Sequence, residues 1–438
     1  MTNLPRGWAQ ATVGEIADLT DGPFGSNLKT AHYTETGPRV IRLQNIGDGV
    51  FRDEHAHVDQ ARYERLIKHA VRPSDIVAAS LGESVPRACL IPGWLGSAIV
   101  KADCIRVRAH EGIDPGFLMW MLNSPPVRAQ AASSIKGVGR PRLGLGGLRN
   151  LTVPVPPDKE QRRILAAIEE QLSRLDSGHR LLRRALVNIG RLRSAILMEA
   201  FAGDWPLEPL ASITDPERPV RYGILMPKEH VEDGILYVRV KDYPRGKIEV
   251  KGLRRTSAEI ADKYRRSTLR SGDVLLAIRG TYGRVAIVPD ELEAGNITQD
   301  TARIAPLPHM DARFLATYLV SEQAQRYFRR VARGVAVKGL NIGDLRTMPI
   351  PVPPLGEQRR IVARTERELS IADAMTAETD RAVLRSGSLR RAILGAAFVG
   401  RLVAQDPDDE PASALIRRIT AARAREPNDP RKRRKAHV

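Results

Sequence analysis

The sequence predicts a protein of mixed α/β (α+β) class, built from two similar domains that are each followed by one long helix. Three observations support this prediction. The chain repeats itself at a spacing of 197 residues. A proline-free segment with an apolar heptad follows a proline-rich phrase, and the phrase and its helix return in the second copy. The segment before each copy alternates strand-like runs with glycine and proline turns. Together these patterns favour two multilayered units.

The repeat is clearest where PVPPDKEQRRI (154–164) returns as PVPPLGEQRRI (351–361). Residues 148–203 align with 345–400 without a gap, and 27 of the 56 positions are identical. A unit of this length is far longer than the roughly 20–50 residues of a solenoid repeat. The pattern therefore predicts a tandem duplication, with two domains related by a pseudo-two-fold axis.

The segments before the repeated phrase differ between the copies. They contain strand-like runs such as RVIRLQNI (39–46) and DVLLAI (273–278), glycine and proline turns, and one helical stretch each, at 115–123 and 311–320. This mixture is typical of α/β or α+β domains. A shared scaffold with divergent domains indicates two variants of one binding surface.

A long helix is expected after each phrase. Proline excludes helix from VPVPP, and Asp158 suits an N-cap with Gln161 placed as in a capping box. The first helix, 158–200, would be about 60 Å long. Its apolar positions alternate three and four apart, as in a coiled coil: Leu165, Ile168, Leu172, Leu175, His179, Leu182, Leu186, Ile189, Arg193 and Ile196.

The second helix has a weaker version of the same seam. Its positions are Val362, Thr365, Leu369, Ala372, Thr376, Thr379, Val383, Ser386, Arg390 and Ile393, while Ile371, Leu384 and Leu389 lie off the seam. Each helix needs an apolar partner, and the other helix is the nearest candidate. The alternative is two unrelated surface helices.

Composition favours a protein without membrane spans that binds a polyanion. The chain has 438 residues, 42% of them hydrophobic, and no apolar run approaches the roughly 20 residues of a membrane span. Cys89 and Cys104 are the two cysteines, so neither a disulfide framework nor a zinc site is indicated, and a reducing cytoplasm is expected. The net charge of +18 is spread along the chain. It suits an extended polyanion or reflects a general arginine-rich composition.

Two glycine-rich turns supply candidate contacts. GPFGSNLK (22–29) offers backbone amides, a hydroxyl and a lysine to phosphate. AIRGTYGR (277–284) presents Arg279, and the first copy has Leu81 at the matching position. The alternative is an ordinary hairpin turn. The candidate DNA contacts are Ser26, Lys29, Arg42, Gln44, Arg140, Arg142, Arg239, Lys241, Arg279, Thr281, Arg284 and Lys338; no metal site and no catalytic residue is predicted.

Several of these features together resemble a known family. The two-copy layout, GPFGSNLK, GDVLLAIRGTYGRVAIVP (272–289), PVPPLGEQRRIV (351–362) and RRAILGAAFVGRL (390–402) resemble the specificity subunit of type I restriction–modification systems. The resemblance covers about residues 1–403, and the repeated helix-start phrase is its most specific part.

The resemblance implies a division of labour along the chain. Residues 1–156 and 204–353 would be target recognition domains, each reading one half of a split duplex DNA site. Residues 157–203 and 354–403 would be spacer helices that pack antiparallel and set the gap. Residues 404–438 lie outside the pattern, and DPDDEP and PRKRRK indicate a disordered basic tail.

The resemblance also implies partners. The chain would have no catalytic activity and no cofactor of its own. It would carry two methyltransferase subunits that use S-adenosylmethionine and, in the full complex, two restriction-translocation subunits. The candidate docking residues are Glu160, Arg162, Arg163, Glu357, Arg359 and Arg360 in the two EQRR phrases. For the arginines, the alternatives are a structural salt bridge to an acidic neighbour, which is the favoured role, and a phosphate contact.

Two other functions remain open from the sequence. One is a DNA-independent scaffold for protein assembly, which salt-dependent and sequence-selective DNA binding would exclude. The other is a nuclease that uses Asp233, Glu249 and Lys251, a triplet that the first copy does not repeat.

Overall fold

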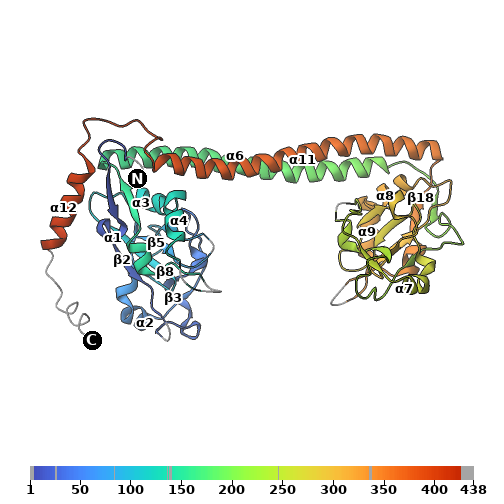
Figure 1. Cartoon of the computed structure of the whole chain (residues 1–438), viewed down its shortest axis with the longest axis horizontal. Coiled ribbons are helices and arrows are strands. Elements are labelled where there is room, and N and C mark those ends of the chain that lie inside the picture. The colour runs from blue at the N-terminus through green and yellow to red at the C-terminus, as the bar shows by residue number, and fades with distance from the viewer. Residues whose placement is uncertain are drawn as a thin grey trace. The chain divides into compact units, whose positions relative to one another are not determined.

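The computed structural model describes residues 4–24, 27–82, 84–135, 137, 141–244, 246–334 and 338–425. Its internal contacts divide it into two units, which we call unit 1 (Met1–Leu181 with Ala382–Val438) and unit 2 (Leu182–Arg381). Each unit combines one globular domain with one part of each of two long helices (Figure 1).

The domain of unit 1 contains two main sheets. The four-stranded antiparallel sheet has the order β2 (Ala17–Asp21), β8 (Cys104–Ala109), β5 (Ile76–Ala79), β6 (Arg87–Leu90). The three-stranded sheet has the order β3 (Thr34–Ile41), β7 (Ala98–Val100), β4 (Ala70–Val71), and β3 runs parallel to β7. A separate antiparallel pair joins β1 (Ala9–Thr12) to β9 (Thr152–Val155). The helices are α1 (Val13–Ile16), α2 (Gln60–Arg65), α3 (Pro115–Leu122), α4 (Pro125–Ala132) and α5 (Leu145–Arg149), with 3₁₀ turns η2 (Thr30–His32), η3 (Leu43–Asn45) and η4 (Ile67–His69).

The domain of unit 2 repeats this plan. Its four-stranded sheet has the order β11 (Arg221–Tyr222), β17 (Thr301–Ile304), β14 (Val274–Ala277), β15 (Val285–Ile287). The three-stranded sheet has the order β13 (Arg254–Thr256), β12 (Ile235–Val238), β16 (Asn296–Ile297), and β10 (Leu207–Pro209) pairs with β18 (Pro349–Pro351). The helices are α7 (Ala258–Lys263), α8 (Ala312–Leu319), α9 (Glu322–Val331) and α10 (Ile342–Arg346), with 3₁₀ turns η5 (Val240–Asp242), η6 (Arg265–Ser267) and η7 (Asp290–Leu292).

The helical stretch expected in each domain begins at an aspartate cap. The Asp114 carboxylate accepts from Phe117 N at 3.0 Å at the start of α3, and Asp311 accepts from Phe314 N at 3.1 Å at the start of α8. Such a cap stabilises a helix by about 1 kcal/mol. Phe117 and Phe314 are buried in the cores of their units. The duplication therefore extends from the repeated phrase into the domains.

The two long helices are α6 (Asp158–Ala200) and α11 (Leu355–Ala397), with 43 residues each. The seam predicted on both helices is confirmed, because its residues are buried or half-buried while Ile371, Leu384 and Leu389 are exposed. A 43-residue helix is about 65 Å long. Among the residues described, no helix is both long and apolar enough to cross a bilayer.

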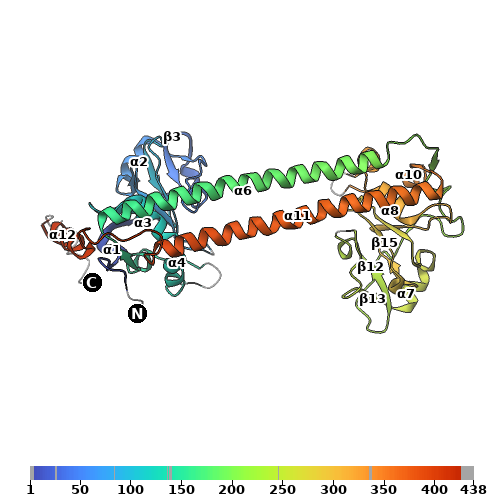
Figure 2. The same ribbon diagram turned by 90° about the horizontal axis from the view of Figure 1, so that it is seen from above.

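The long helices pair through ion pairs, and one of these pairs occurs at equivalent positions in both units. In unit 1 Asp176 bonds Arg390 at 2.5 Å, and in unit 2 Arg193 pairs with Asp373, which are the same two positions shifted by 197. In unit 2 Glu199 also pairs with Arg364. In unit 2 residue numbers therefore rise along α6 as they fall along α11, so the two helices run antiparallel (Figure 2).

The repeated EQRR phrase attaches each long helix to its domain through a buried glutamine. Gln161 Oε1 accepts from Asp114 N at 2.9 Å, and its Nε2 donates to the carbonyls of Gly112 and Pro156. Gln358 makes the same three bonds to Asp311, His309 and Pro353. The predicted capping box between Asp158 and Gln161 is therefore wrong. The amide instead satisfies buried backbone groups, which would cost about 1–3 kcal/mol each if left unpaired.

The end of the described chain corrects a second expectation. Residues 412–425 do not form a disordered tail; they form helix α12 (Ala412–Arg425) beside α1 (Figure 1). Ala412, Leu415 and Ile419 share one face and are buried in the core of unit 1, and Arg423 Nη1 donates to Gly14 O at 2.9 Å. The expectation followed the charge of this segment and overlooked the helical spacing of its apolar residues. Residues 426–438, with the basic run, lie outside the described residues.

Candidate nucleic-acid interface

The glycine-rich turn after β14 presents Arg279 to solvent. Gly280 and Gly283 have φ of +67° and +86°, a region that glycine enters without strain. Arg279 forms an isolated β-bridge with Gly339, and its Nη1 donates to Gln299 Oε1 at 3.3 Å. The turn therefore places an exposed guanidinium just beyond the end of β14.

Arg279 lines a cleft of about 670 Å³. The other lining residues are Tyr222, Ile278, Gln299, Arg333, Gly339, Leu340, Asn341 and Ile342. Arginine can bond the O6 and N7 edge of guanine, and glutamine or asparagine can bond the N6 and N7 edge of adenine. The cleft gathers both kinds of side chain, with an exposed tyrosine at its margin.

Unit 1 builds the same bridge with its arginine at the other position of the pair. Leu81 pairs with Arg142, the positions that match Arg279 and Gly339, which confirms the predicted alignment of Leu81 with Arg279. In unit 2 a Cβ at Gly339 would lie 3.3 Å from Arg279 Cγ and 3.1 Å from Ile278 O. The bridge in unit 2 therefore has little room for a second long side chain.

Arg142 is held more firmly than Arg279. Its Nη2 lies 2.5 Å from Asp103 Oδ1, and its guanidinium carbon lies 4.6 Å from the centre of the Phe24 ring. Burial raises the pKa of the neighbouring Asp21, against the opposing influence of Arg142. An arginine stacked on an aromatic ring and paired with a carboxylate is oriented in advance.

The other candidate DNA contacts divide into three groups. Lys29, Gln44, Lys241, Thr281 and Lys338 are exposed, and Lys338 adjoins the cleft next to Gly339. Arg42 and Arg239 occupy matching turns but bond within their domains, Arg42 Nη2 to His55 O at 2.8 Å and Arg239 Nε to Asp242 Oδ2 at 2.8 Å. Arg284 is half-buried. Ser26 and Arg140 lie outside the described residues.

Sequence reasoning missed most of the cleft around Arg279. Tyr222 lies on β11, Gln299 precedes β17, Arg333 follows α9, and Asn341 caps α10 by accepting from Gly343 N at 2.9 Å. No local periodicity connects these positions. Only the strand order, which places β17 between β11 and β14, brings them together.

The candidate docking residues are not equally accessible. Glu160 has an exposed fraction of only 1% and accepts from Trp8 Nε1 at 3.0 Å, so its assignment to docking is wrong. Burial raises its pKa. Arg163 pairs with Asp409 at 2.5 Å, and Asp409 lies in the segment that was expected to be disordered. Arg162, Arg359 and Arg360 are exposed, although Arg162 pairs with Asp158, and Arg360 pairs with the half-buried Glu357.

Comparisons with known proteins agree with this architecture. Residues 233–374 match the family described as type I restriction modification DNA specificity domain. The specificity subunit of the type I restriction enzyme EcoBI from Escherichia coli is 27% identical over 456 residues, covering 95% of this chain and 92% of that protein. The EcoKI specificity subunit from Escherichia coli strain K12 is 24% identical over 460 residues, covering 96% of each.

Two solved structures show the same fold. A chain from a study of complex assembly and conformational transition of the type I R-M system has a TM-score of 0.75 at 23% identity, covering 92% of this chain and all of that one. The HsdS subunit from Thermoanaerobacter tengcongensis has a TM-score of 0.56 at 21% identity, covering 91% and 98%. These two structures confirm the fold of two tandem domains with two long antiparallel helices, and the sequence matches confirm the resemblance to specificity subunits.

Proposed function

We propose that this chain is the non-catalytic DNA-recognition subunit of a type I restriction–modification complex in the cytoplasm, and that it reads a bipartite duplex site. The observation that carries the proposal is the bridge built twice, Leu81–Arg142 in unit 1 and Arg279–Gly339 in unit 2. Each domain presents one arginine at this bridge, from the opposite position of the pair and with different neighbours. Two domains built alike but lined differently suit two half-sites of different sequence.

The net charge of +18 supports a polyanionic ligand. Basic side chains supply the salt-dependent attraction to phosphates, and the contacts in the two domains select the bases. Within this proposal α6 and α11 set the gap between the half-sites, because α6 connects the two domains in the sequence and α11 pairs with it.

Exposed apolar residues on the long helices support protein partners. In unit 1 they are Leu181, Leu384 and Leu389; in unit 2 they are Val187, Leu192, Met198, Ile371 and Met375. Val187 and Leu192 match Leu384 and Leu389 through the duplication, so both units expose the same apolar positions. The recurrence of exposed apolar residues at the same two positions of both helices is what a surface used twice would show. A surface present twice suits two copies of one partner, here two methyltransferase subunits that bring S-adenosylmethionine, with restriction-translocation subunits joining the full complex.

The test is selection of duplexes from a random-sequence library by the full chain, alone and with its methyltransferase partner, over a series of salt concentrations. We expect enrichment of one bipartite motif with a fixed gap, and affinity that falls steeply as salt rises. Binding without sequence preference or salt dependence would instead favour the assembly scaffold. DNA cleavage by the chain alone, abolished by Asp233→Asn, would favour the nuclease.

A further inference from the structure

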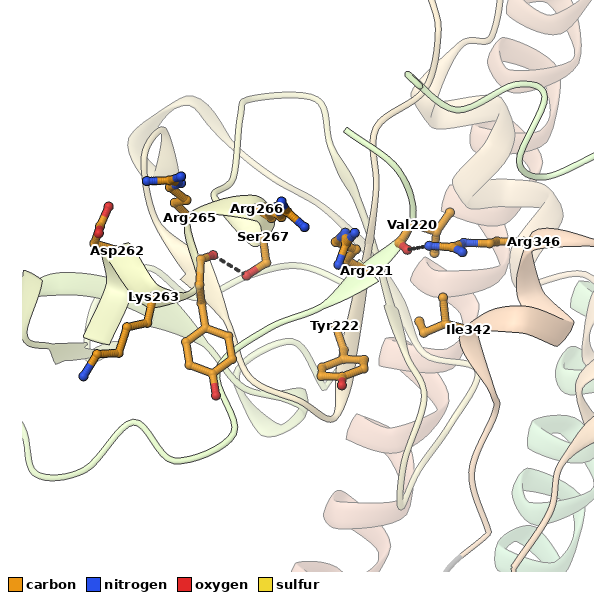
Figure 3. Close-up of a pocket in the computed structure, with 11 residues that line it drawn as sticks. Val220, Arg221, Tyr222, Asp262, Lys263, Arg265, Arg266, Ser267, Ile342 and Arg346 are labelled. Carbon is orange, nitrogen blue, oxygen red and sulfur yellow. Dashed lines mark hydrogen bonds between the residues drawn. The ribbon is translucent and has the colours of Figure 1, made fainter. Parts of the chain in front are cut away.

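A second cleft in unit 2 gathers four arginines beside the first cleft (Figure 3). Its volume is about 610 Å³, and Tyr222 and Ile342 line both clefts, so the two are neighbours. The basic residues that line it are Arg221 on β11, Lys263, Arg265 and Arg266 near η6, and Arg346 on α10. In Figure 3 Arg266 and Arg346 enter from opposite sides, with Arg221 between them.

The positive charges that line this cleft outnumber the negative ones. Among its described lining residues Asp262 alone is acidic, and Lys263 is paired with Glu259 at 2.8 Å. Over the described residues, none of the four arginines has an acidic partner, and Arg346 Nη2 donates to the carbonyl of Val220 at 3.1 Å. Close cations repel one another unless an anion lies between them.

A fifth arginine lies beneath the cleft. Arg303 is fully buried on β17, opposite Arg221 in the strand register, and its Nη2 donates to the carbonyls of Arg266 and Pro219. In the described part of the chain its Nε and Nη1 have no hydrogen-bond acceptor, and neither has Nε of Arg221. The pKa of Arg303 is lowered to about 10, mainly by burial and then by the charge of Arg218, against the opposing influence of Asp273 and Asp215. Buried guanidinium groups without acceptors add to the positive potential of the cleft.

Unit 1 provides an internal comparison. Arg106 of unit 1 occupies the position of Arg303. Arg106 donates to Lys68 O at 3.3 Å, and Arg303 donates to Arg266 O. In the strand register Arg106 lies opposite Thr20, and Arg303 lies opposite Arg221. In unit 1 the positions of Arg221, Arg265 and Arg266 are therefore held by Thr20, Ile67 and Lys68. Thr20 Oγ1 accepts from Arg106 Nη2 at 2.8 Å, so a neutral acceptor replaces a further cation. The cluster of arginines is a property of unit 2.

We propose that this cleft binds one backbone phosphate of the duplex whose bases lie in the neighbouring cleft; the inference rests on the proposed function. Guanidinium groups bond phosphate oxygens through two parallel N–H donors, and these bonds are stronger than neutral ones. The contact is made to the sugar–phosphate backbone, so it holds unit 2 on the duplex without selecting a base. Inorganic phosphate and free nucleotides carry the same chemical group, and the arms of the experiment separate these sources.

The test uses the full chain with Arg266→Ala, because the Arg266 side chain is exposed and only its backbone carbonyl bonds Arg303. Lys68→Ala, at the matching turn of unit 1, is the control for loss of one exposed charge. Affinity is measured over a salt series on a duplex selected by the wild type and on a random duplex. We expect Arg266→Ala to weaken both by about tenfold, the scale of a lost hydrogen bond to a charged group, and to lower the salt slope by about 1. Lys68→Ala should change both less.

A duplex in which single phosphates are replaced by neutral methylphosphonates provides the second arm. One replacement should weaken the wild type but leave Arg266→Ala unchanged. Wild-type affinity and slope in Arg266→Ala would overturn the inference, as would a loss confined to the selected duplex, which would make Arg266 a base contact. Protection of the wild type from thermal unfolding by pyrophosphate, lost in Arg266→Ala without any change in DNA affinity, would assign the cleft to a free anion. Failure of the wild type to select any duplex would instead refute the proposed function itself.

Discussion

Removing Arg279 or Arg142 should relax one half-site each and leave the other intact. Arg279 is exposed and makes one 3.3 Å bond to Gln299, so Arg279→Ala should change the free energy of unfolding by less than about 0.5 kcal/mol. A bidentate arginine–guanine contact contributes about 1–3 kcal/mol of discrimination. At about 1.4 kcal/mol per factor of ten, the preferred base at one position should lose about 5- to 150-fold of its advantage.

Arg142→Ala should have the same effect on the other half-site but a larger effect on stability. It removes a 2.5 Å ion pair to Asp103, whose side chain is mostly buried, and the stacking on Phe24. These contacts together contribute about 1–2 kcal/mol. Arg142→Lys is the informative companion, because lysine keeps the charge but cannot make the planar, two-pronged contact.

The assay is the random-library selection repeated with each variant, followed by dissociation constants on duplexes that differ at single positions. Changes in both half-sites from one substitution would refute the assignment of one half-site to each domain. An equal loss on selected and random duplexes would show that the arginine contacts phosphate. Wild-type selectivity with Arg279→Ala would make Arg279 an ordinary turn residue.

Three further predictions concern the helices and their attachment. Gln161→Ala removes the amide that pairs with three buried backbone groups, so it should destabilise unit 1 by about 3 kcal/mol. Hydrogen exchange should become faster at the Asp114 amide and stay unchanged at the Asp311 amide, and Gln358→Ala should show the reverse. Equal exchange at both amides in either variant would contradict this prediction. Glu160→Gln keeps an acceptor for Trp8. Burial raises the pKa of Glu160 in the folded protein above 4.5, so its ionisation destabilises the folded state as pH rises through that raised pKa. Glu160→Gln should therefore be more stable than the wild type at pH 7. Thermal melts should show that this difference disappears below pH 4.5. Insertion of one heptad at matching points of α6 and α11 preserves the seam and lengthens each helix by about 10 Å. Library selection should then return the same half-sites, bound more weakly and separated by a gap longer by about two to four base pairs. An unchanged gap at full affinity would show that the helices do not set the gap.

The sequence by itself determined the features that depend on local spacing. A heptad pattern indicates which face of a helix is buried, so the seams of α6 and α11 follow from the order of the residues alone. This holds even for the less apolar seam of α11, in which Thr365 and Ala372 are buried. An offset of 197 identified the duplicated units, and a one-residue shift to 198 aligned Leu81 with Arg279. The spacing of Ala412, Leu415 and Ile419 is also that of one helix face, so the sequence contains the pattern of α12 as well.

Tertiary structure alone decided what the polar residues do. Nothing local indicates that Gln161 bonds Asp114, that Glu160 is buried under Trp8, or that Arg163 meets Asp409, because each partner lies 47 to 246 positions away. Both clefts of unit 2 likewise depend on the order of strands in one sheet, which sets β11 beside β17 and β17 beside β14. Hydrogen bonds and ion pairs act over a few ångströms in space, and sequence patterns record only the neighbours that a helix or a strand supplies.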